Sequence, residues 1–97
     1  MENMQINIYI IGSLSQADFI KKLAKHFKEN ACFNVKYVHE KNKPIETIIH
    51  DCFDTIEWSQ YVIAVQKPDN SLGRGTLYEI EYATRLGKPV CLVVTKS

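Results

Sequence analysis

The amino-acid sequence predicts an α/β fold, in which a small parallel sheet of about four strands carries helices on both faces. Short runs of consecutive apolar residues alternate with segments whose apolar residues recur every three or four positions. These are the patterns of buried strands and of amphipathic helices. One helical segment separates each apolar run from the next, and such crossovers are typical of parallel strands. No repeat or linker interrupts the pattern, so residues 1–97 are expected to form a single domain.

The first half of the chain predicts two strands and one helix. Residues 5–11, QINIYII, form a β-branched run that ends at Gly12 and predicts a buried strand. A helix is expected to start at Ser15, because Ser15 and Asp18 have the spacing of a capping box. A second strand is predicted over residues 34–39. The helix between them has an apolar stripe formed by Phe19, Ile20, Leu23, Ala24 and Phe27.

The second half predicts two more helices and two more strands. Pro44 suits the first turn of a helix. Residues 61–65, YVIAV, and residues 90–94, VCLVV, are short apolar runs that predict buried strands. Between them a helix is predicted over residues 76–86, and Gly87 suits its C-terminal cap. The helix after Pro44 has an apolar stripe formed by Ile45, Ile48, Ile49, Cys52, Phe53 and Ile56.

Composition and charge exclude several classes of protein. A net charge of +1 with 24% charged residues argues against a nucleic-acid binder that works through bulk positive charge. No apolar stretch approaches the length of about 18 residues that a membrane span needs. The first five residues are polar and do not resemble a signal peptide, so a cytoplasmic protein is expected.

The three cysteines are expected to be reduced thiols. Cys32, Cys52 and Cys91 are an odd number, and none of them belongs to a C-x-x-C pair. The three histidines show no ligand spacing with them. Neither a metal nor another cofactor is therefore expected.

Ligands of such sheets bind at the carboxyl ends of the strands, near the switch in strand order. The segments expected there are residues 12–15, 39–41 and 66–75, together with the helix starts that follow them. Glu79 lies about one turn into the third predicted helix. An ionised carboxylate at a junction between strand and helix could act as a nucleophile on a sugar carbon. However, Thr76 and Glu79 also have the spacing of a capping box, so the residues leave both roles open.

Other polar residues near these loops also have two interpretations. Gly73, Arg74 and Gly75 precede the predicted helix, where they could grip an anion or form a plain turn. Tyr9 lies inside the first predicted strand, where it could orient a carboxylate or simply pack in the core. Asp51 on the second predicted helix is a candidate for the site or a surface residue.

Two further acidic residues are expected on the surface. Glu81 points roughly opposite to Glu79 on the third predicted helix and is expected on its solvated face. Asp54 lies opposite the apolar stripe of the second predicted helix.

Two segments of the chain resemble a known family. They are IYIIGSLS near the start and SQYVIAVQKPDNSLGRGTLYEIEYATRLGKPV between Ser59 and Val90. The pattern resembles the nucleoside 2-deoxyribosyltransferase family and the related deoxynucleoside 5′-monophosphate N-glycosidases. The resemblance implies a small doubly wound sheet of flavodoxin or Rossmann type, which agrees with the fold predicted above.

The resemblance implies a role for each residue that matches the family pattern. Glu79 matches the nucleophilic glutamate, which attacks the anomeric carbon of a 2-deoxyribosyl group and forms a glycosyl-enzyme. Tyr9 matches a first-strand tyrosine that contacts the active site. The family aspartate near the end of the second helix helps to protonate the leaving base. The strict register places Cys52 there, with Asp51 adjacent as the candidate acid.

The loops match the substrate-binding part of the family pattern. The two residues after the first strand match the loop that lies against the sugar or its phosphate. The loop before the third helix matches the phosphate contacts of the branch that cleaves monophosphates, although it is two residues longer here. The candidate substrate-binding residues are Gly12, Ser13, Asp69, Ser71, Gly73 and Arg74.

The chain also departs from the family pattern in two further places. Gln60 stands where an aspartate is common before the third strand, and Glu81 replaces the glycine of Glu-x-Gly-Tyr-Ala. The chain ends directly after the fourth predicted strand, whereas the transferases are longer, so hydrolysis or binding is expected in preference to base transfer.

These observations support three hypotheses. The first is an enzyme that cleaves or transfers the N-glycosidic bond of a nucleoside or its 5′-monophosphate. The second is an inactive module of the same fold that binds a nucleotide or a nucleotide-derived signal. The third is a structural or protein-interaction domain. A homodimer or higher homo-oligomer is also expected, because a domain of this size gains apolar burial by association.

Overall fold

The structure is a computed structural model, and it describes residues 5–37 and 45–94, with the side chains of residues 45–49 left out. Four parallel strands form one sheet in the order β2-β1-β3-β4. The α/β prediction with a four-stranded parallel sheet is confirmed. The strands are β1 (Ile6–Ile11), β2 (Phe33–Tyr37), β3 (Tyr61–Gln66) and β4 (Val90–Val94).

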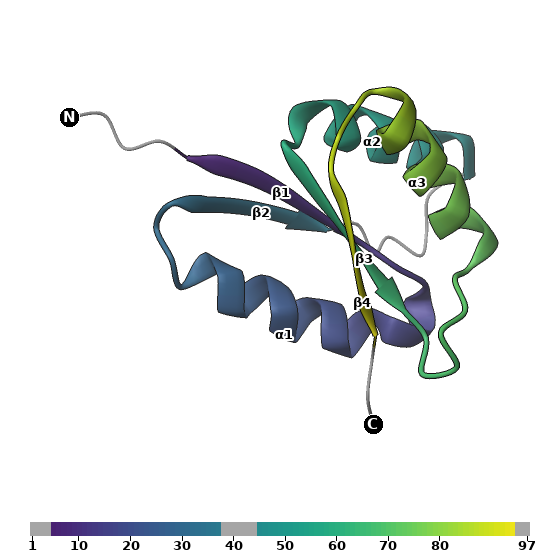
Figure 1. Ribbon diagram of the computed structural model, residues 1–97, viewed down its shortest axis with the longest axis horizontal. Helices are drawn as coiled ribbons and strands as arrows, with labels where there is room; N and C mark the ends of the chain where they lie inside the picture. Colours follow the sequence, from purple (N-terminus) through teal and green to yellow (C-terminus); the bar gives the residue numbers. More distant parts are fainter. Residues whose placement is uncertain (1–4, 38–44, 95–97) are drawn as a thin grey trace.

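Helices cover both faces of the sheet, so the fold is doubly wound as predicted (Figure 1). Helix α1 (Ala17–Lys28) lies on one face, preceded by the short 3₁₀ helix η1 (Leu14–Gln16). Helices α2 (Ile45–Trp58) and α3 (Arg74–Arg85) lie on the other face. None of the helices in the described ranges is long and apolar enough to cross a membrane.

Alternate residues of the central strands point into two separate cores, because successive side chains of a strand face opposite sides of the sheet. Ile8 and Ile10 of β1 pack with Ile20 and Ala24 on the α1 side. Tyr9 and Ile11 of the same strand join the second core, on the side of α2 and α3. That second core also contains Ile56, Val62, Ala64 and Ala83. The pattern places Tyr9 on the face that α3 covers.

The start of the first helix differs from the prediction. The Ser15 cap is wrong, because η1 precedes α1 and neither helix has a side-chain hydrogen bond at its N-cap. The Ser15 hydroxyl instead pairs with the Ser13 hydroxyl at 2.8 Å. The Gln16 amide donates to the Ser13 carbonyl at 2.9 Å, which closes the 3₁₀ turn.

Helix α3 also starts earlier than predicted. Gly73 is its N-cap, in an extended conformation, and Arg74 and Gly75 are already helical. The C-terminal prediction is confirmed. Gly87 has a φ of 74° and follows the C-cap residue, and its amide donates to the Thr84 carbonyl while the Lys88 amide donates to the Ala83 carbonyl. These two bonds form a Schellman motif.

The remaining boundaries agree closely with the sequence. Strand β3 extends to Gln66, one residue beyond the prediction, and β4 has the predicted bounds. Strand β2 is described as far as Tyr37. The predicted strand residues 38 and 39, the candidate segment 39–41 and Pro44 lie outside the described residues.

Candidate functional site

The strand order places the candidate loops beside one another. Strands β1 and β3 are neighbours, and the crossovers that leave them lie on opposite faces of the sheet. This is the switch point at which doubly wound folds bind ligands. The loop after β1 begins at Gly12, and the loop after β3 leads to α3. A methyl group on Gly73 would lie 3.5 Å from Ser13 Cβ, so the two loops meet there.

Gly12 allows the first loop to pass close to the sheet. A methyl group at this position would lie 2.8 Å from Ile20 Cδ1, a distance that real contacts do not show. It would also lie 3.3 Å from Val65 Cβ and 3.4 Å from the Val65 carbonyl oxygen. Glycine therefore lets β1, β3 and α1 pack closely here, since any side chain would displace Ile20 and press on Val65.

The loop after β3 is held by hydrogen bonds of its own. The carboxylate of Asp69 accepts from both the amide and the hydroxyl of Ser71, and these bonds lower the pKa of Asp69. The Lys67 amide donates to the Ser71 carbonyl at 2.9 Å, and Asn70 adopts a positive φ of 68°. The predicted pair Asp69 and Ser71 therefore lies together on an exposed loop, where each side chain binds the other. Arg74 is exposed at the first position of α3.

The capping role considered for Glu79 is wrong. Because Gly73 is the N-cap, Thr76 lies inside α3 and Glu79 lies more than one turn from the start of the helix. The Leu77 amide donates to the Gly73 carbonyl at 3.0 Å, as in a regular first turn. The Glu79 side chain therefore does not cap α3, and its charge acts on Tyr9 of β1.

The half-buried Glu79 of α3 acts on the buried Tyr9 of β1 and Cys52 of α2, and we call these three residues the Glu79 cluster. Hydrogen bonding with Tyr9 and Cys52 favours the ionised form of the Glu79 carboxyl, whose Oε2 atom is buried without a partner among the described residues. Burial raises the pKa of Glu79 to about 7, against the opposing effect of the two hydrogen bonds. A carboxyl group that changes protonation state near neutral pH in a buried setting is a common feature of functional sites.

The other two groups of the cluster stay protonated at neutral pH. Burial, and then the charge of Glu79, raise the pKa of the Tyr9 hydroxyl far above its ordinary value. The same two causes raise the pKa of the Cys52 thiol to about 11. The cluster therefore offers one ionisable carboxyl and two neutral donors.

The architecture is shared with solved structures. One of them is a CMP N-glycosidase, BcmB, from Clostridium botulinum, and the two folds superpose with a TM-score of 0.64. The alignment covers 91% of this chain and 71% of that one, at 18% sequence identity. The likeness establishes the fold. No family model matches the sequence, and no curated protein matches it either.

Asp51 lies next to the cluster on α2 and is half-buried. Its charge acts on the Cys52 thiol, and the Thr55 hydroxyl donates to its backbone carbonyl at 2.7 Å. The groups that act on the Glu79 carboxyl itself are Tyr9 and Cys52. Sequence analysis placed Cys52 in an apolar stripe and did not include it in the site. The one available signal was the family register, which puts Cys52 at the position of the acid.

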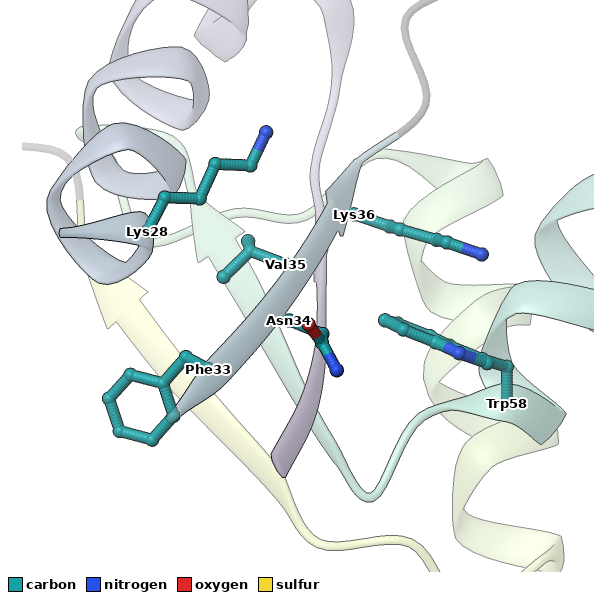
Figure 2. A pocket seen from close by; sticks show the side chains of 6 residues that line it. All are labelled: Lys28, Phe33, Asn34, Val35, Lys36 and Trp58. Atoms are coloured by element: carbon teal, nitrogen blue, oxygen red, sulfur yellow. The ribbon is translucent and has the colours of Figure 1, made fainter. Parts of the chain in front are cut away.

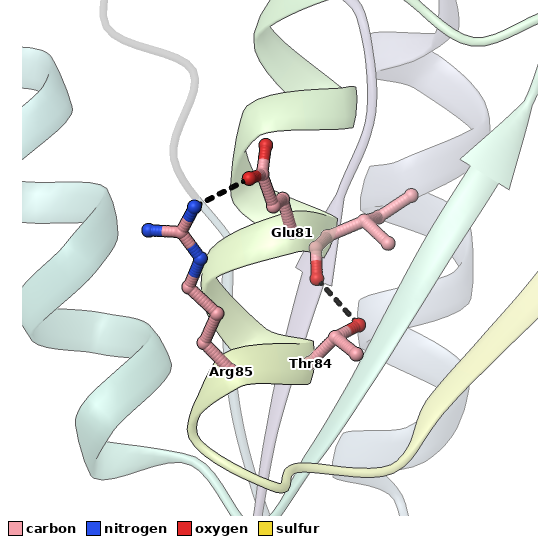
Figure 3. Close-up of polar contacts among 4 residues, drawn as sticks. Glu81, Thr84 and Arg85 are labelled. Atoms are coloured by element: carbon pink, nitrogen blue, oxygen red, sulfur yellow. Dashed lines mark hydrogen bonds and ion pairs between the residues drawn. The ribbon is translucent and has the colours of Figure 1, made fainter.

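Two acidic residues expected on the surface do lie there. Asp54 is exposed. Glu81 accepts a hydrogen bond from Arg85 Nη2 at 2.7 Å on the outer face of α3 (Figure 3). Thr84 donates to the Ile80 carbonyl in the same turn. Glu81 therefore plays no part in the Glu79 cluster.

A hollow along β2 is separate from this site. Lys36 Nζ lies 4.3 Å from the centroid of the Trp58 ring, and Asn34 lies beside them (Figure 2). Such a cation–π contact favours an ordered edge of the sheet. Within the described ranges, no three His, Cys, Asp or Glu side chains gather as metal ligands.

Proposed function

We propose that this protein cleaves the N-glycosidic bond of a nucleoside 5′-monophosphate, or of the corresponding nucleoside, with Glu79 as the nucleophile. The observation that carries the proposal is the Glu79 carboxyl on α3, whose Oε2 atom is buried and unpartnered among the described residues and whose pKa is raised by burial. The fold of the CMP N-glycosidase BcmB supports the substrate class. Strong desolvation also makes a carboxylate a better nucleophile than it is in water.

The proposed reaction has two steps. In the first, the ionised Glu79 carboxylate attacks C1′ of the sugar, and the bond between C1′ and the base nitrogen breaks. The electron pair of that bond stays with the base, which takes up one proton. In the second step, water attacks C1′ and loses a proton, and Glu79 leaves as a carboxylate. Two displacements at one carbon retain its configuration.

We assign the remaining roles by position. The Tyr9 hydroxyl orients the carboxyl by donating to it. Asp51 is the proposed proton donor to the base, because its carboxyl lies near enough to act on Cys52 inside the site. Ser13 and Gly73, which meet between the loops, bind the 5′-phosphate, and Arg74 at the start of α3 adds a positive charge. Asp69 and Ser71 hold the loop in the shape that this requires.

A second candidate is a module that binds the nucleotide without cleaving it. Cys52 occupies the position that the family register gives to an acid, and its thiol pKa of about 11 makes it a poor proton donor. In this case the protein would bind nucleotides without turnover, and the ligand would raise the melting temperature.

The test is chromatography of free base released from a panel of nucleosides and nucleoside 5′-monophosphates, CMP included. Wild type is compared with Glu79→Gln and with Glu81→Gln, a matched change on the exposed face of the same helix. Release by wild type and by Glu81→Gln, and its loss in Glu79→Gln, is the expected result. If folded wild type releases no base but gains stability from a nucleotide, the binding module is correct. Equal release by Glu79→Gln would contradict the role of Glu79.

A further inference from the structure

We propose that the outer edge of β2 binds an extended, acidic segment of another protein, whose consecutive carboxylates meet Lys28 and Lys36 on opposite faces of the sheet. This surface uses none of the three residues of the Glu79 cluster. The inference therefore does not depend on the proposed function, and binding can be measured without any release of base.

The backbone of β2 has one unpaired side, because within the described residues this strand pairs with β1 alone. The Ile6 amide of β1 donates to the Cys32 carbonyl at 2.8 Å, so the backbone of Cys32 faces β1. Backbone groups of successive strand residues face opposite edges, which gives Asn34 and Lys36 the same direction as Cys32. The amide and the carbonyl of Val35 therefore face outward. Another strand could pair with these two groups, as peptides do when they add to the edge of a sheet.

One lysine flanks this edge on each face of the sheet. Lys28 is the last residue of α1, and Lys36 extends from β2 on the other side, toward the end of α2 (Figure 2). Lys28 Nζ lies 5.8 Å from the centroid of the Tyr37 ring, and Lys36 Nζ lies 4.3 Å from that of the Trp58 ring. Both lysines are exposed. The aromatic rings therefore hold the two cations beside the edge while water and a ligand can still reach them.

The surface along this edge is positive and has no carboxylate. Two adjoining hollows follow β2, the larger of about 400 Å³, and their linings contain Lys28 and Lys36 but no aspartate or glutamate. Within the described ranges neither lysine forms an ion pair with a carboxylate. The other edge strand, β4, has the sequence VCLVV and carries no charge. An acidic partner therefore finds complementary charge along β2 and none on β4 itself.

The position of the two lysines on opposite faces determines the pattern of acidic residues in the partner. Successive side chains of an extended chain point to opposite faces of a sheet. Two consecutive carboxylates can therefore reach Lys28 and Lys36 at the same time. Two carboxylates separated by one residue point to the same face, so they can reach only one of the lysines.

The contrasting explanation is that Lys36 only protects the edge. A lysine on an edge strand discourages pairing with another chain, and natural sheets use it for this purpose. The two explanations differ in one measurable property. A protected edge does not bind an added strand of any sequence, whereas the proposed surface binds one with the correct spacing of carboxylates.

The first experiment compares two peptides by isothermal titration calorimetry. Thr-Val-Thr-Glu-Glu-Thr-Val-Thr has adjacent glutamates, and Thr-Val-Glu-Thr-Glu-Val-Thr-Thr has the same composition with one residue between them. Both are blocked at their ends, so their net charge is equal. We expect saturable binding of the first peptide and about two- to fivefold weaker binding of the second, which can form only one of the two ion pairs. Equal affinities, or no binding of either peptide, would overturn the inference.

Substitution of each lysine tests its part in this preference. Lys28→Gln and Lys36→Gln should each weaken binding of the first peptide by about two- to fivefold and remove its advantage over the second, because one lysine remains. Lys22→Gln is the matched control, since Lys22 is also exposed on α1 but lies outside both hollows. It should keep the wild-type affinities. An equal loss in Lys22→Gln would show that the peptides respond to net charge alone, and this result would overturn the inference.

Amide hydrogen exchange then shows where the first peptide binds. The Val35 amide should exchange at least about tenfold more slowly in the complex, because it gains a hydrogen bond from the added strand. Leu92, on the opposite edge strand, serves as the internal control and should keep its rate. Unchanged exchange at Val35 in the saturated complex would show that the carboxylates bind without strand pairing, which contradicts the proposal. An oligodeoxynucleotide that has the same net charge and binds as tightly would also contradict it, since the surface would then bind anions of any kind.

Discussion

Glu79 is a carboxyl whose pKa is raised from its ordinary acidic value into the neutral range. A carboxyl that is removed from water without a cationic partner favours its neutral form. The hydrogen bonds from Tyr9 and Cys52 offset part of this effect, and the pKa of Glu79 still rises to about 7. An anion held in this way weakens the folded state, as is typical of residues placed for function.

The first prediction concerns stability as a function of pH. Below pH 4.5 Glu79 is protonated in both states and has no effect on the free energy of unfolding. As pH rises from 4.5 to about 7, the unfolded chain releases its proton first, so ionisation favours unfolding. At higher pH the loss levels off at about 3 kcal/mol. Glu79→Gln should therefore be more stable than wild type at pH 8 and should lose this advantage near pH 4, as measured by urea denaturation.

The control for this prediction is Glu81→Gln on the same helix. The Glu81 carboxyl is exposed and paired with Arg85 in an i,i+4 ion pair. Such exposed pairs contribute little, commonly about 0.5 kcal/mol. The variant should follow the wild-type curve between pH 5 and 8. If Glu81→Gln changes the pH dependence of stability as much as Glu79→Gln does, the buried Glu79 carboxyl is not the cause of that dependence.

The second prediction compares two glycines. Gly12→Ala should reduce stability by about 1–3 kcal/mol, because its methyl group would overlap Ile20 and press on Val65. Gly75→Ala should instead increase stability by roughly 0.5–1 kcal/mol, since Gly75 is helical and has nothing within 4 Å of the added methyl group. Thermal unfolding of both variants tests the pair, and equal shifts would contradict the packing at Gly12.

At the scale of the element, the sequence predicted every α-helix and strand in the described ranges, but it missed the 3₁₀ helix η1 and misplaced two helix starts. The spacing of apolar residues reflects burial along a whole segment, so the helices and strands themselves could be predicted from the sequence. Helix starts depend on a few residues, and here the capping-box spacings at Ser15 and Thr76 occur by coincidence. Gly73, which carries no side chain, is the N-cap of α3. For the same reason the capping role considered for Glu79 was wrong.

The candidate site was predictable only in part. Tyr9 and Glu79 were selected from sequence, and the structure places both in the Glu79 cluster. Cys52 was not selected, because its position in an apolar stripe is explained by burial alone. Its contact with Glu79 depends on how α2 and α3 pack against each other, and this information is not local in the sequence.

The third prediction concerns the contact between α2 and α3. The rings of Phe53 and Tyr82 stack with centroids 4.2 Å apart, and the Tyr82 hydroxyl donates to Glu57 at 2.8 Å. Tyr82→Phe keeps the stacked ring and should change stability by less than about 1 kcal/mol. Tyr82→Ala should cost about 2–3 kcal/mol, because it loses the stacking and half-buried apolar area. Urea denaturation of both variants measures the difference, and equal losses would show that the hydroxyl dominates.

At the scale of the whole molecule, the strand order gives the two central strands more neighbours than the two edge strands. Strands β1 and β3 each pair with two neighbours and have a core on either face. Within the described residues β2 pairs with β1 and β4 pairs with β3, each on one side. The Glu79 cluster rests on β1, so its tyrosine belongs to the best supported part of the fold.

The fourth prediction is the order of amide hydrogen exchange. Amides of β1 and β3 should exchange only through global unfolding, and those of β4 should exchange at least about tenfold faster through local opening. Leu92, at the middle of β4, is 53% exposed, which is consistent with the weaker burial of this strand. Exchange measured by NMR at each amide tests the order. Protection of β4 equal to that of β1 would indicate that another chain covers this edge.

The Lys36–Trp58 contact has an optical consequence. Trp58 is the only tryptophan of the chain, so tryptophan fluorescence comes from the junction between β2 and the end of α2. Its backbone carbonyl accepts a hydrogen bond from Asn7 of β1 at 3.1 Å, which ties this reporter to the central strand. The emission of a single indole will therefore follow the detachment of α2 from the sheet without any label. Trp58 does not belong to the Glu79 cluster. Substitutions in that cluster therefore leave the tryptophan itself unchanged.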